Sequence, residues 1–432
     1  MKIRSSVAPA ALAVFLVAVA IRLAFLAAVP GWHLDTDHLT GDSIDFHTLA
    51  VNLDHGRGYA LEWRGAGPLR GHLRPTAFRA PVWPAMVAGV YKVTGSSSPT
   101  TGRVAVVLID AATCALVVVL GTRLATRRVG VAAGLLCVIY LPLLANTTQL
   151  LSDPLFGLLM VLVLLAADHY RRAPSLGRAA VVGLLLGVSI LTRANGSLVA
   201  IPIVLWMAWT ARRSGWPVVF ARAGVAALVG VAVIVPWLVR NEVRMHAFVP
   251  VATQSGSVLG GAYNSKMTDR GNPSWGTWDY ASVIGPYFSA PSEVAWDRTV
   301  RKAGLRWMGD HKGGTVKLWV MHAQRYFDLF WEQGARTTVL QGNPSPSRTV
   351  NLFAVPEWWV LAVLGVLGVV DLRRRHVLGP WVPGLLLFAG LAFSGVFLAD
   401  ATRYRAPGDF VVILLAAVWI SERVRVGLRP AR

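Results

Sequence analysis

The residues best suited to chemistry begin with two carboxylates near the N-terminus. Asp42 and Asp45 are three residues apart at the start of the stretch 42–53. Later in this stretch Leu49, Asn52 and Leu53 recur at helical spacing. This spacing predicts a short amphipathic helix with both acids on one face, where either could serve as a general base. A helix N-cap together with a solvated acid explains them about equally well, so both interpretations stay open.

A third carboxylate, Asp153, lies at the predicted start of another helix. It separates the polar stretch 146–149 from an apolar run that begins at Pro154. An acid in this position is more often a simple N-cap before proline than a functional group. The order of the apolar runs puts Asp153 on the same membrane face as Asp42, which strengthens the functional interpretation.

Two short motifs place arginine close to proline at predicted membrane boundaries. Arg79 precedes Ala-Pro, and Arg403, Tyr404 and Arg405 precede a second Ala-Pro. A guanidinium group can bind a phosphate through two parallel hydrogen bonds, so these residues are candidate phosphate ligands. Snorkelling toward lipid head groups is the alternative for each single arginine.

Histidines accompany the acids of the first outer loop, which we define as residues 30–78. None of them shows the paired spacing that is typical of metal ligands. The sequence therefore assigns no cofactor and no metal ligand, and leaves a divalent metal ion as an alternative. The histidines are His33, His38, His47, His55 and His72.

The composition predicts that most of the chain lies in a membrane. The 432 residues are 54% hydrophobic and 15% charged, with a mean hydropathy of +0.52. A soluble core of this size could not bury so much apolar surface. The net charge of +20 comes from short arginine-rich knots and not from one continuous basic face, which argues against nucleic acid as a partner. Cys114 and Cys137 lie in apolar runs and indicate no metal site.

Apolar runs long enough, or nearly so, to cross roughly 30 Å of hydrocarbon recur along the chain. We expect an all-α polytopic membrane protein with about 10 to 12 transmembrane helices. The stretch 81–94 is apolar but interrupted by Pro84, and it predicts a re-entrant or juxtamembrane helix. The predicted spans are 8–29, 103–122, 129–145, 154–170, 179–192, 196–211, 219–239, 353–371, 378–399 and 407–421.

The arginine-rich knots predict the orientation of these spans. With the N-terminus inside, the knots fall on one side, and the positive-inside rule makes that side cytoplasmic. We therefore expect a multi-pass membrane protein with cytoplasmic N- and C-termini. Only six of the 42 basic residues are lysine, and with abundant alanine and valine this indicates a GC-rich bacterial genome and so the bacterial inner (plasma) membrane. The knots are 123–128, 171–178, 212–222, 373–375 and the C-terminal tail.

The same orientation predicts three regions. Residues 1–240 form an N-terminal transmembrane module whose first outer loop carries the chemistry. Residues 241–351, called the outer segment below, are rich in tryptophan and form a partly ordered region on the outer membrane surface. Residues 352–432 add the C-terminal transmembrane helices.

Taken in order, the motifs resemble glycosyltransferase family 39 of the C-type glycosyltransferase superfamily, which includes protein O-mannosyltransferases and lipid A aminoarabinose transferases. The resemblance covers most of the first 265 residues and the C-terminal end, and it leaves 266–347 unmatched. It rests on Asp42 with Phe46 and Ala50, Phe78-Arg79-Ala80-Pro81, Leu151-Ser152-Asp153, Leu191-Thr192-Arg193, Pro236-Trp237 before Arg240-Asn241, and Arg403-Tyr404-Arg405-Ala406-Pro407.

The resemblance implies roles for individual residues. Asp42 would be the catalytic acid of the first outer loop and Asp153 a second outer acid of the same cavity. Arg79 stands where the family often has a basic residue that meets the donor phosphate. The family often has an acidic pair in the first loop, whereas Ser43 follows Asp42 here, so Asp45 is the candidate for the missing partner.

The reaction implied by the resemblance is an inverting transfer of a hexosyl or pentosyl group. The donor would be a polyprenyl-phosphate sugar, and the acceptor a hydroxyl of a protein, lipid or glycan on the outer face. Two alternatives stay open at this point. A transporter or flippase of lipid-linked sugars would also need phosphate-binding arginines, and a scaffold of an envelope complex would use the charged residues as an interface.

Overall fold

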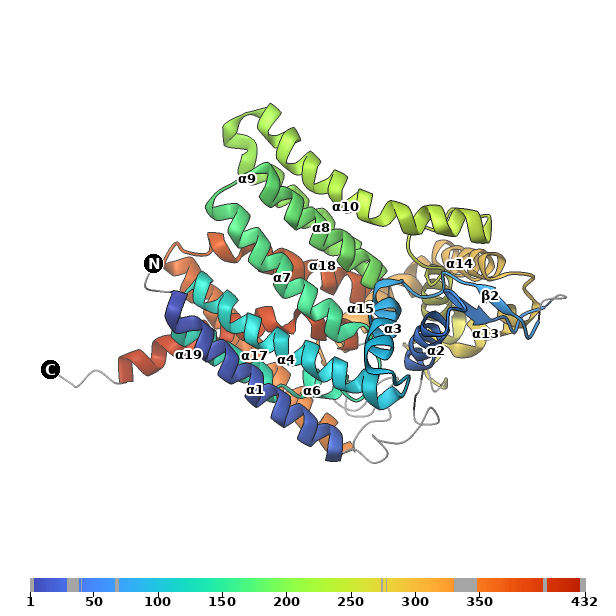
Figure 1. The fold of residues 1–432 in the computed structure, drawn as a ribbon, viewed down its shortest axis with the longest axis horizontal. Coiled ribbons are helices and arrows are strands. Elements are labelled where there is room, and N and C mark those ends of the chain that lie inside the picture. Colours follow the sequence, from blue (N-terminus) through green and yellow to red (C-terminus); the bar gives the residue numbers. More distant parts are fainter. Residues whose placement is uncertain are drawn as a thin grey trace.

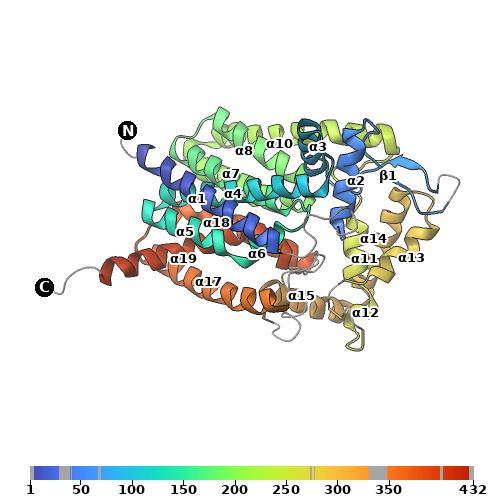
Figure 2. The ribbon, with the colours of Figure 1, turned by 60° about the horizontal axis from the view of Figure 1, so that its bottom comes forward.

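The chain is a bundle of long helices with a layer of shorter elements at one end, as Figures 1 and 2 show. The computed structural model describes residues 4–28, 39, 41–66, 70–272, 275, 276, 278–329, 348–398 and 402–427. The helix α1 begins, and α19 ends, at the end of the bundle remote from that layer (Figure 1). Two parts of the predicted outer regions, residues 30–38 of the first outer loop and residues 330–347 of the outer segment, fall outside the described residues.

Helices of membrane-spanning length make up most of the bundle. Among the described residues, seven helices are long and apolar enough to cross a membrane. This confirms the all-α polytopic membrane fold. They belong to α1 (Arg4–Ala28), α4 (Pro99–Leu124), α7 (Asp153–Arg172), α9 (Ser197–Ala211), α10 (Trp216–Met245), α17 (Arg348–Arg374) and α18 (Val382–Phe397).

Three further helices lie in the same bundle and coincide with predicted spans. They are α5 (Arg127–Ile139), α8 (Leu176–Thr192) and α19 (Ala406–Gly427). The predicted span 129–145 is divided, because Tyr140 is extended and α6 (Leu141–Asn146) begins anew with Pro142 near its first position. The helix α10 continues to Met245, so the predicted boundary at 240 falls inside it.

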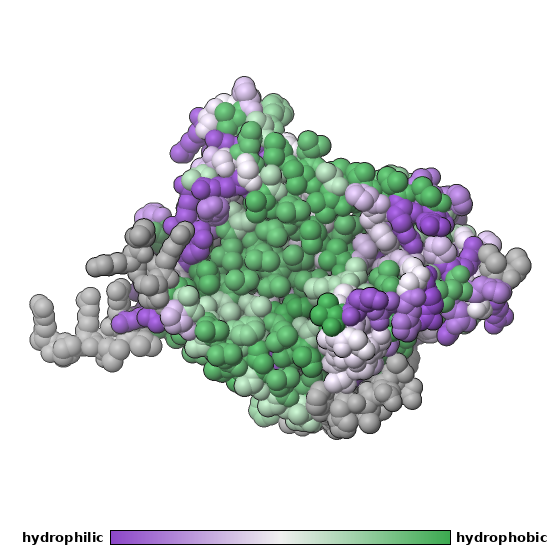
Figure 3. Space-filling view, in the orientation of Figure 1, coloured by the Kyte–Doolittle hydropathy of each residue, from purple (hydrophilic) through white to green (hydrophobic). Residues whose placement is uncertain are grey.

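The surface of the bundle matches a lipid environment. Figure 3 shows a broad hydrophobic area over the middle of the helices, with hydrophilic residues at both ends. Leu205, Trp209 and Leu228 are each more than half exposed on this surface. Exposing such apolar side chains to water costs free energy, whereas exposing them to hydrocarbon does not.

Inside the bundle, small residues and a buried ion pair join the helices. A Cβ atom added to Gly183 of α8 would lie 2.1 Å from the carbonyl oxygen of Ala226 on α10, so these helices approach at van der Waals distance. Arg22 of α1 pairs with Asp110 of α4, and both are almost fully buried. The pair accounts for the charge in the first span without assigning it a role in chemistry.

The layer at the other end contains the predicted first-loop helix. The helix α2 (Asp42–Asp54) begins at Asp42, and α3 (Val82–Thr94) matches the helix expected over 81–94. Between them, β1 (Ala60–Glu62) and β2 (Leu73–Pro75) form an antiparallel hairpin that the sequence analysis did not predict. The outer segment supplies α11 (Ser255–Ala262), α12 (Ser265–Thr268), α13 (Tyr280–Ser289), α14 (Glu293–Asp310) and α15 (Lys312–Tyr326).

Tryptophan builds the packing between the first outer loop and the outer segment. Trp63 of the loop and Trp296 of α14 are buried in one apolar cluster with Val283 and Val300. The indole nitrogen of Trp296 donates to the carbonyl oxygen of Val283 at 3.0 Å. The outer layer is therefore held by its own apolar core in addition to its attachment to the bundle.

The orientation of the chain is testable by cysteine labelling, because the native Cys114 and Cys137 are buried. Ser289 is exposed at the end of α13, and Ser214 is exposed at the opposite end of the bundle. We expect a membrane-impermeant maleimide added to intact cells to label Ser289→Cys and to spare Ser214→Cys until the cells are opened. Labelling of Ser214→Cys alone in intact cells would reverse the predicted orientation.

Candidate active site

The helix α2 presents two acids from its first turn. Asp42 and Asp45 lie at its N-terminus, where the helix dipole favours negative charge. Phe46 and Leu49 follow Asp42 at helical spacing on the same side of α2 and, with Ala50, are buried against the bundle. Burial of that side places both carboxylates near the starts of α7 and α19.

Arg79 joins these two acids. Its Nη2 atom lies 2.7 Å from Asp42 Oδ1 and 2.6 Å from Asp45 Oδ2, and its Nε donates to the same Asp45 oxygen at 3.1 Å. The guanidinium lies over the rings of Phe46 and Phe78, at 5.3 and 4.5 Å from their centres. These contacts fix the plane of the arginine and leave it almost fully buried.

The outer segment holds the backbone that carries Arg79. Glu293, the first residue of α14, accepts hydrogen bonds from the hydroxyls of Thr76 and Thr253 and from the amide of Ala77. The hydroxyl of Tyr59 donates to the carbonyl oxygen of Arg79 at 2.8 Å. Burial raises the pKa of Glu293, and the three hydrogen bonds oppose this shift without cancelling it.

Arg403 links the first outer loop to the second acid. Its Nη2 lies 2.8 Å from Asp42 Oδ2, and its Nε lies 3.1 Å from Asp153 Oδ2. Arg193 also binds this oxygen, with its Nη1 at 2.7 Å. Carboxylates and guanidinium groups thus alternate in one continuous series of ion pairs, which we call the charge network. Its members, in spatial order, are Asp45, Arg79, Asp42, Arg403, Asp153 and Arg193.

The structure brings together most of the predicted site residues. Asp42 and Asp153 are far apart in sequence and share Arg403, as the predicted topology required. Tyr404 lies beside the network, with the guanidinium carbons of Arg193 and Arg403 at 5.0 and 5.9 Å from its ring centre.

Arg405 does not join this site. Its side chain is completely buried and binds Asp409 and Asp328 inside the protein. The prediction that it binds a phosphate is corrected on this ground, because its donors are directed away from Asp42 and Asp153. In a tight turn the side chains of neighbouring positions diverge, so Arg403 and Arg405 point to different surroundings.

Electrostatics keep Asp42 and the two arginines that bind it ionised. Burial alone would raise the pKa of Asp42, but Arg79 and Arg403 outweigh it, so the pKa of this carboxyl lies below its ordinary value. For Arg79 and Arg403 burial acts in the opposite sense and lowers the pKa. The neighbouring acids outweigh burial and raise the pKa of both arginines above the ordinary value. Three acids and three arginines leave the network close to neutral.

The carboxylates differ in the acceptor capacity they have left. Each oxygen of Asp42 accepts one guanidinium hydrogen bond. Asp153 uses only Oδ2, and its buried Oδ1 accepts no hydrogen bond from the described residues. Loss of one arginine contact would give Asp42 an oxygen without a bound cation, which can take a proton from a substrate.

Two residues of the site were not predicted as functional. Arg193 was predicted as part of the Leu-Thr-Arg motif and as a charge at an outer helix end, facing a polar cavity or snorkelling, without an assigned role. It lies directly after the apolar helix α8. Glu293 lies in the stretch for which the sequence offered no resemblance. An acidic residue at the start of a helix is so common that the sequence offered no reason to select Glu293.

The histidines that the structure describes in the first outer loop do not converge on the acids. His47 is buried and its Nδ1 lies 2.9 Å from the hydroxyl of Tyr91, while His55 bonds Arg57 at the surface. Among the described residues, no group of three or more histidine, cysteine, aspartate or glutamate side chains could hold a metal ion. His33 and His38 lie outside the described residues.

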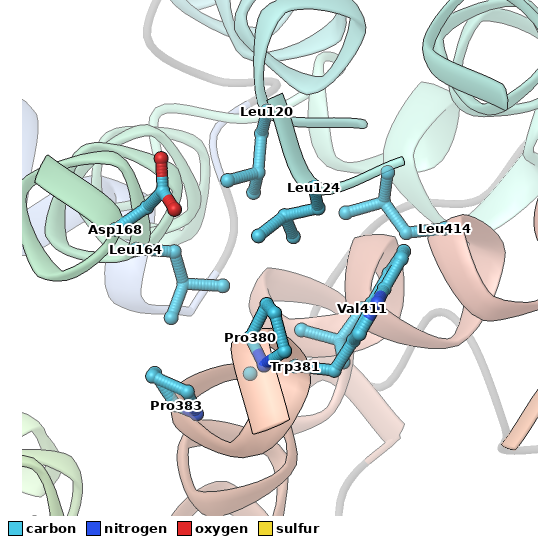
Figure 4. Close-up of a pocket in the computed structure, with 10 residues that line it drawn as sticks. Leu120, Leu124, Leu164, Asp168, Pro380, Trp381, Pro383, Val411 and Leu414 are labelled. Atoms are coloured by element: carbon cyan, nitrogen blue, oxygen red, sulfur yellow. The ribbon is translucent and has the colours of Figure 1, made fainter. Parts of the chain in front are cut away.

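A pocket at the opposite end of the bundle differs in kind from this site. It lies between α4, α7, α18 and α19, and its walls are almost entirely apolar, as Figure 4 shows. The one acid in its lining, Asp168, is already paired with Arg123, Arg171 and Arg172. The pocket therefore offers no free group for catalysis.

Comparison with known proteins confirms the resemblance seen in the motifs. Residues 78–239 match a family model described as dolichyl-phosphate-mannose-protein mannosyltransferase. The matched range contains Arg79, Asp153 and Arg193 of the charge network. A search of curated proteins finds no match.

Solved structures share the fold. The crystal structure of the Archaeoglobus fulgidus oligosaccharyltransferase tethered with an acceptor peptide has a TM-score of 0.57 at 13% identity, covering 96% of this chain and 50% of that chain. The same organism's oligosaccharyltransferase AglB, in complex with an inhibitory peptide and a dolichol-phosphate, has a TM-score of 0.56 at 15% identity, covering 98% and 52%. The chain thus spans about half the length of these proteins.

A weaker likeness links the chain to ArnT from Cupriavidus metallidurans bound to undecaprenyl phosphate. The TM-score is 0.41 at 17% identity, covering 95% of this chain and 78% of that chain.

The charge network makes a prediction about stability. Replacing Arg79 by glutamine removes the cation between Asp42 and Asp45, so we expect the free energy of unfolding to fall by about 1 to 3 kcal/mol at pH 7. Because Arg79 lowers the pKa of Asp42 below its ordinary 3.8, this contribution is complete above that value and declines only as the pH falls from it toward the lowered pKa. Thermal unfolding in detergent at pH 7 and at about pH 2 measures both effects.

The matched control for this variant is Arg64→Gln. Arg64 pairs with Glu62 at 3.5 Å, but both side chains are about half exposed or more. Its loss should change the unfolding midpoint little at either pH. A deficit of Arg79→Gln that stays equally large at about pH 2 would show that the arginine stabilises the fold by packing and not by charge.

Proposed function

We propose that the protein is a membrane glycosyltransferase that moves a sugar from a polyprenyl-phosphate donor to an acceptor hydroxyl on the outer face of the membrane. The observation that carries this proposal is the sharing of Arg403 by Asp42 and Asp153 at the end of the bundle remote from the arginine-rich knots. A carboxylate beside paired guanidinium groups suits the transfer of a group away from a phosphate. The family match over 78–239 supports the same reaction class.

The donor phosphate binds to Arg403 and Arg193 in this proposal, with Arg79 close by. Both Arg403 and Arg193 already bond one oxygen of Asp153 and lie beside the ring of Tyr404. The dolichol-phosphate in the complex of the archaeal relative supports a lipid phosphate as ligand. Because the network is neutral without a ligand, an arriving phosphate competes with the carboxylates for the guanidinium groups.

This competition prepares the base. When the phosphate takes the Nη2 hydrogen bond of Arg403, Oδ2 of Asp42 becomes free to accept a hydrogen bond from the acceptor hydroxyl. The hydroxyl oxygen attacks the anomeric carbon, its proton passes to Asp42, and the bond from that carbon to the phosphate oxygen breaks. The electron pair leaves with the phosphate, where Arg403 and Arg193 stabilise it. One displacement of this kind inverts the configuration.

The remaining acids hold the arginines in place. Asp153 keeps Arg403 and Arg193 together through one oxygen. Asp45 binds the Nε and Nη2 of Arg79 and so keeps that guanidinium in plane beside Asp42. Asp45 thus orients its cation, Asp153 occupies the donors of Arg403 and Arg193 until the phosphate displaces it, and Asp42 takes part in proton transfer.

The finer assignments belong to the same proposal. The transferred group is a hexosyl or pentosyl unit, the acceptor is a protein, lipid or glycan, and the site faces the exterior of a bacterial inner membrane with both termini in the cytoplasm. The basic end of the bundle supports this orientation through the positive-inside rule. The transporter or flippase alternative requires no carboxylate base, and neither the family match nor the shared fold supports it.

The base is tested by Asp42→Asn. The amide keeps the shape of the side chain but cannot take up the proton, and general-base catalysis contributes about 10²- to 10⁴-fold in rate, so we expect transfer to fall by at least about 10²-fold. The assay follows release of polyprenyl phosphate together with glycosylation of the acceptor in reconstituted vesicles. Asp54→Asn is the matched control, because Asp54 is on the same helix and bonds Ser97 away from the network.

Near-normal transfer by Asp42→Asn would remove this residue from the mechanism. Movement of the intact donor lipid across the vesicle membrane, without consumption and without release of polyprenyl phosphate, would instead identify a flippase. The control variant separates both outcomes from a general loss of folded protein.

A further inference from the structure

A second buried charge cluster lies next to the charge network and has no part in the proposed chemistry. At its centre is Arg405, which is completely buried. Its Nε donates to Asp409 at 3.1 Å, its Nη2 lies 3.0 Å from Asp328, and its Nη1 donates to the carbonyl oxygen of Tyr326 at 2.6 Å. Its guanidinium also stacks on the ring of Trp358, with the central carbon at 3.6 Å from the ring centre.

This cluster joins parts of the chain that are far apart in sequence. Tyr326 and Asp328 are at the end of α15 in the outer segment, while Asp409 is in the first turn of α19. Asp409 also accepts a hydrogen bond from the hydroxyl of Tyr140, between α5 and α6. The outer segment, the bundle and the start of α19 therefore meet at one guanidinium group.

The turn at Arg405 also carries Arg403. Residues Thr402–Tyr404 form a single 3₁₀ turn that leads directly into α19. Two nearby contacts hold the adjacent end of α18 to the outer segment, since Tyr263 donates its hydroxyl to the carbonyl oxygen of Phe397 and His322 bonds that of Val396. The backbone on both sides of Arg403 is thus attached to the outer segment.

We propose that Arg405 is a positioning residue for the donor site: by binding the end of α15, it holds the turn from which Arg403 reaches Asp42, Asp153 and the donor phosphate. This inference rests on the proposed function, because it assigns Arg403 to the phosphate. A guanidinium that contacts Asp328, Asp409 and a backbone carbonyl together cannot move without moving the turn. A lysine has a single ammonium group and cannot keep this planar set of bonds.

The experiment measures binding of undecaprenyl phosphate to the full-length protein in detergent. We expect Arg405→Lys to weaken the affinity on the order of tenfold, as a displaced charge-assisted hydrogen bond does. Arg403→Gln should weaken it as well, and the double variant should bind no more weakly than Arg403→Gln alone, because Arg405 acts only through Arg403. Arg22→Lys is the matched control, since Arg22 is as fully buried and pairs with Asp110 away from the site.

The outcomes separate the inference from the function beneath it. Three results would each overturn the positioning role. Arg405→Lys could leave the affinity for undecaprenyl phosphate unchanged, or weaken it equally whether or not Arg403 is present. The control Arg22→Lys could weaken the affinity as much as Arg405→Lys does. Absence of binding by the unaltered protein would overturn the proposed donor site itself. Asp328→Asn, which keeps Arg405 but removes one of its partners, should weaken binding in the same direction if Arg405→Lys does not fold.

Discussion

The site depends on one guanidinium group, that of Arg403, which bonds Asp42 from α2 and Asp153 from α7 at the same time. Two carboxylates brought to one place without a cation would repel each other and lose their hydration. The arginine makes their proximity favourable, and its guanidinium group can also bind a phosphate. The same contact therefore stabilises the resting site and prepares it for a ligand.

Most of the remaining architecture serves to hold this arrangement. The apolar side of α2 packs on the bundle, so its acids face inward, and α7 begins with Asp153 at the same end. The outer segment contributes from the other side, because Glu293 holds the backbone before Arg79 and the end of α15 holds Arg405. The region without a recognised resemblance thus binds Ala77, two residues before Arg79, and Arg405, two residues after Arg403.

The sequence predicted much of the site for physical reasons. Apolar run length and arginine-rich knots determine which loops share a membrane face, so the meeting of Asp42 and Asp153 followed from topology. Helical spacing correctly predicted α2 from its first residue. Side-chain direction in a tight turn is not encoded in spacing, however, and the motif Arg-Tyr-Arg could not reveal that Arg403 points to the acids and Arg405 into the protein. The β-hairpin and the contacts of Glu293 depend on tertiary packing, which local patterns do not report.

The most direct test of this account is the affinity of Asp153→Asn for undecaprenyl phosphate, compared with Asp168→Asn. Asp168 is an equally buried, arginine-bound acid at the opposite end of the bundle. If carboxylates compete with the phosphate for Arg403 and Arg193, the loss of charge at Asp153 should tighten binding, and the Asp168 variant should bind as the unaltered protein does. Unchanged or weaker binding by Asp153→Asn would contradict the account.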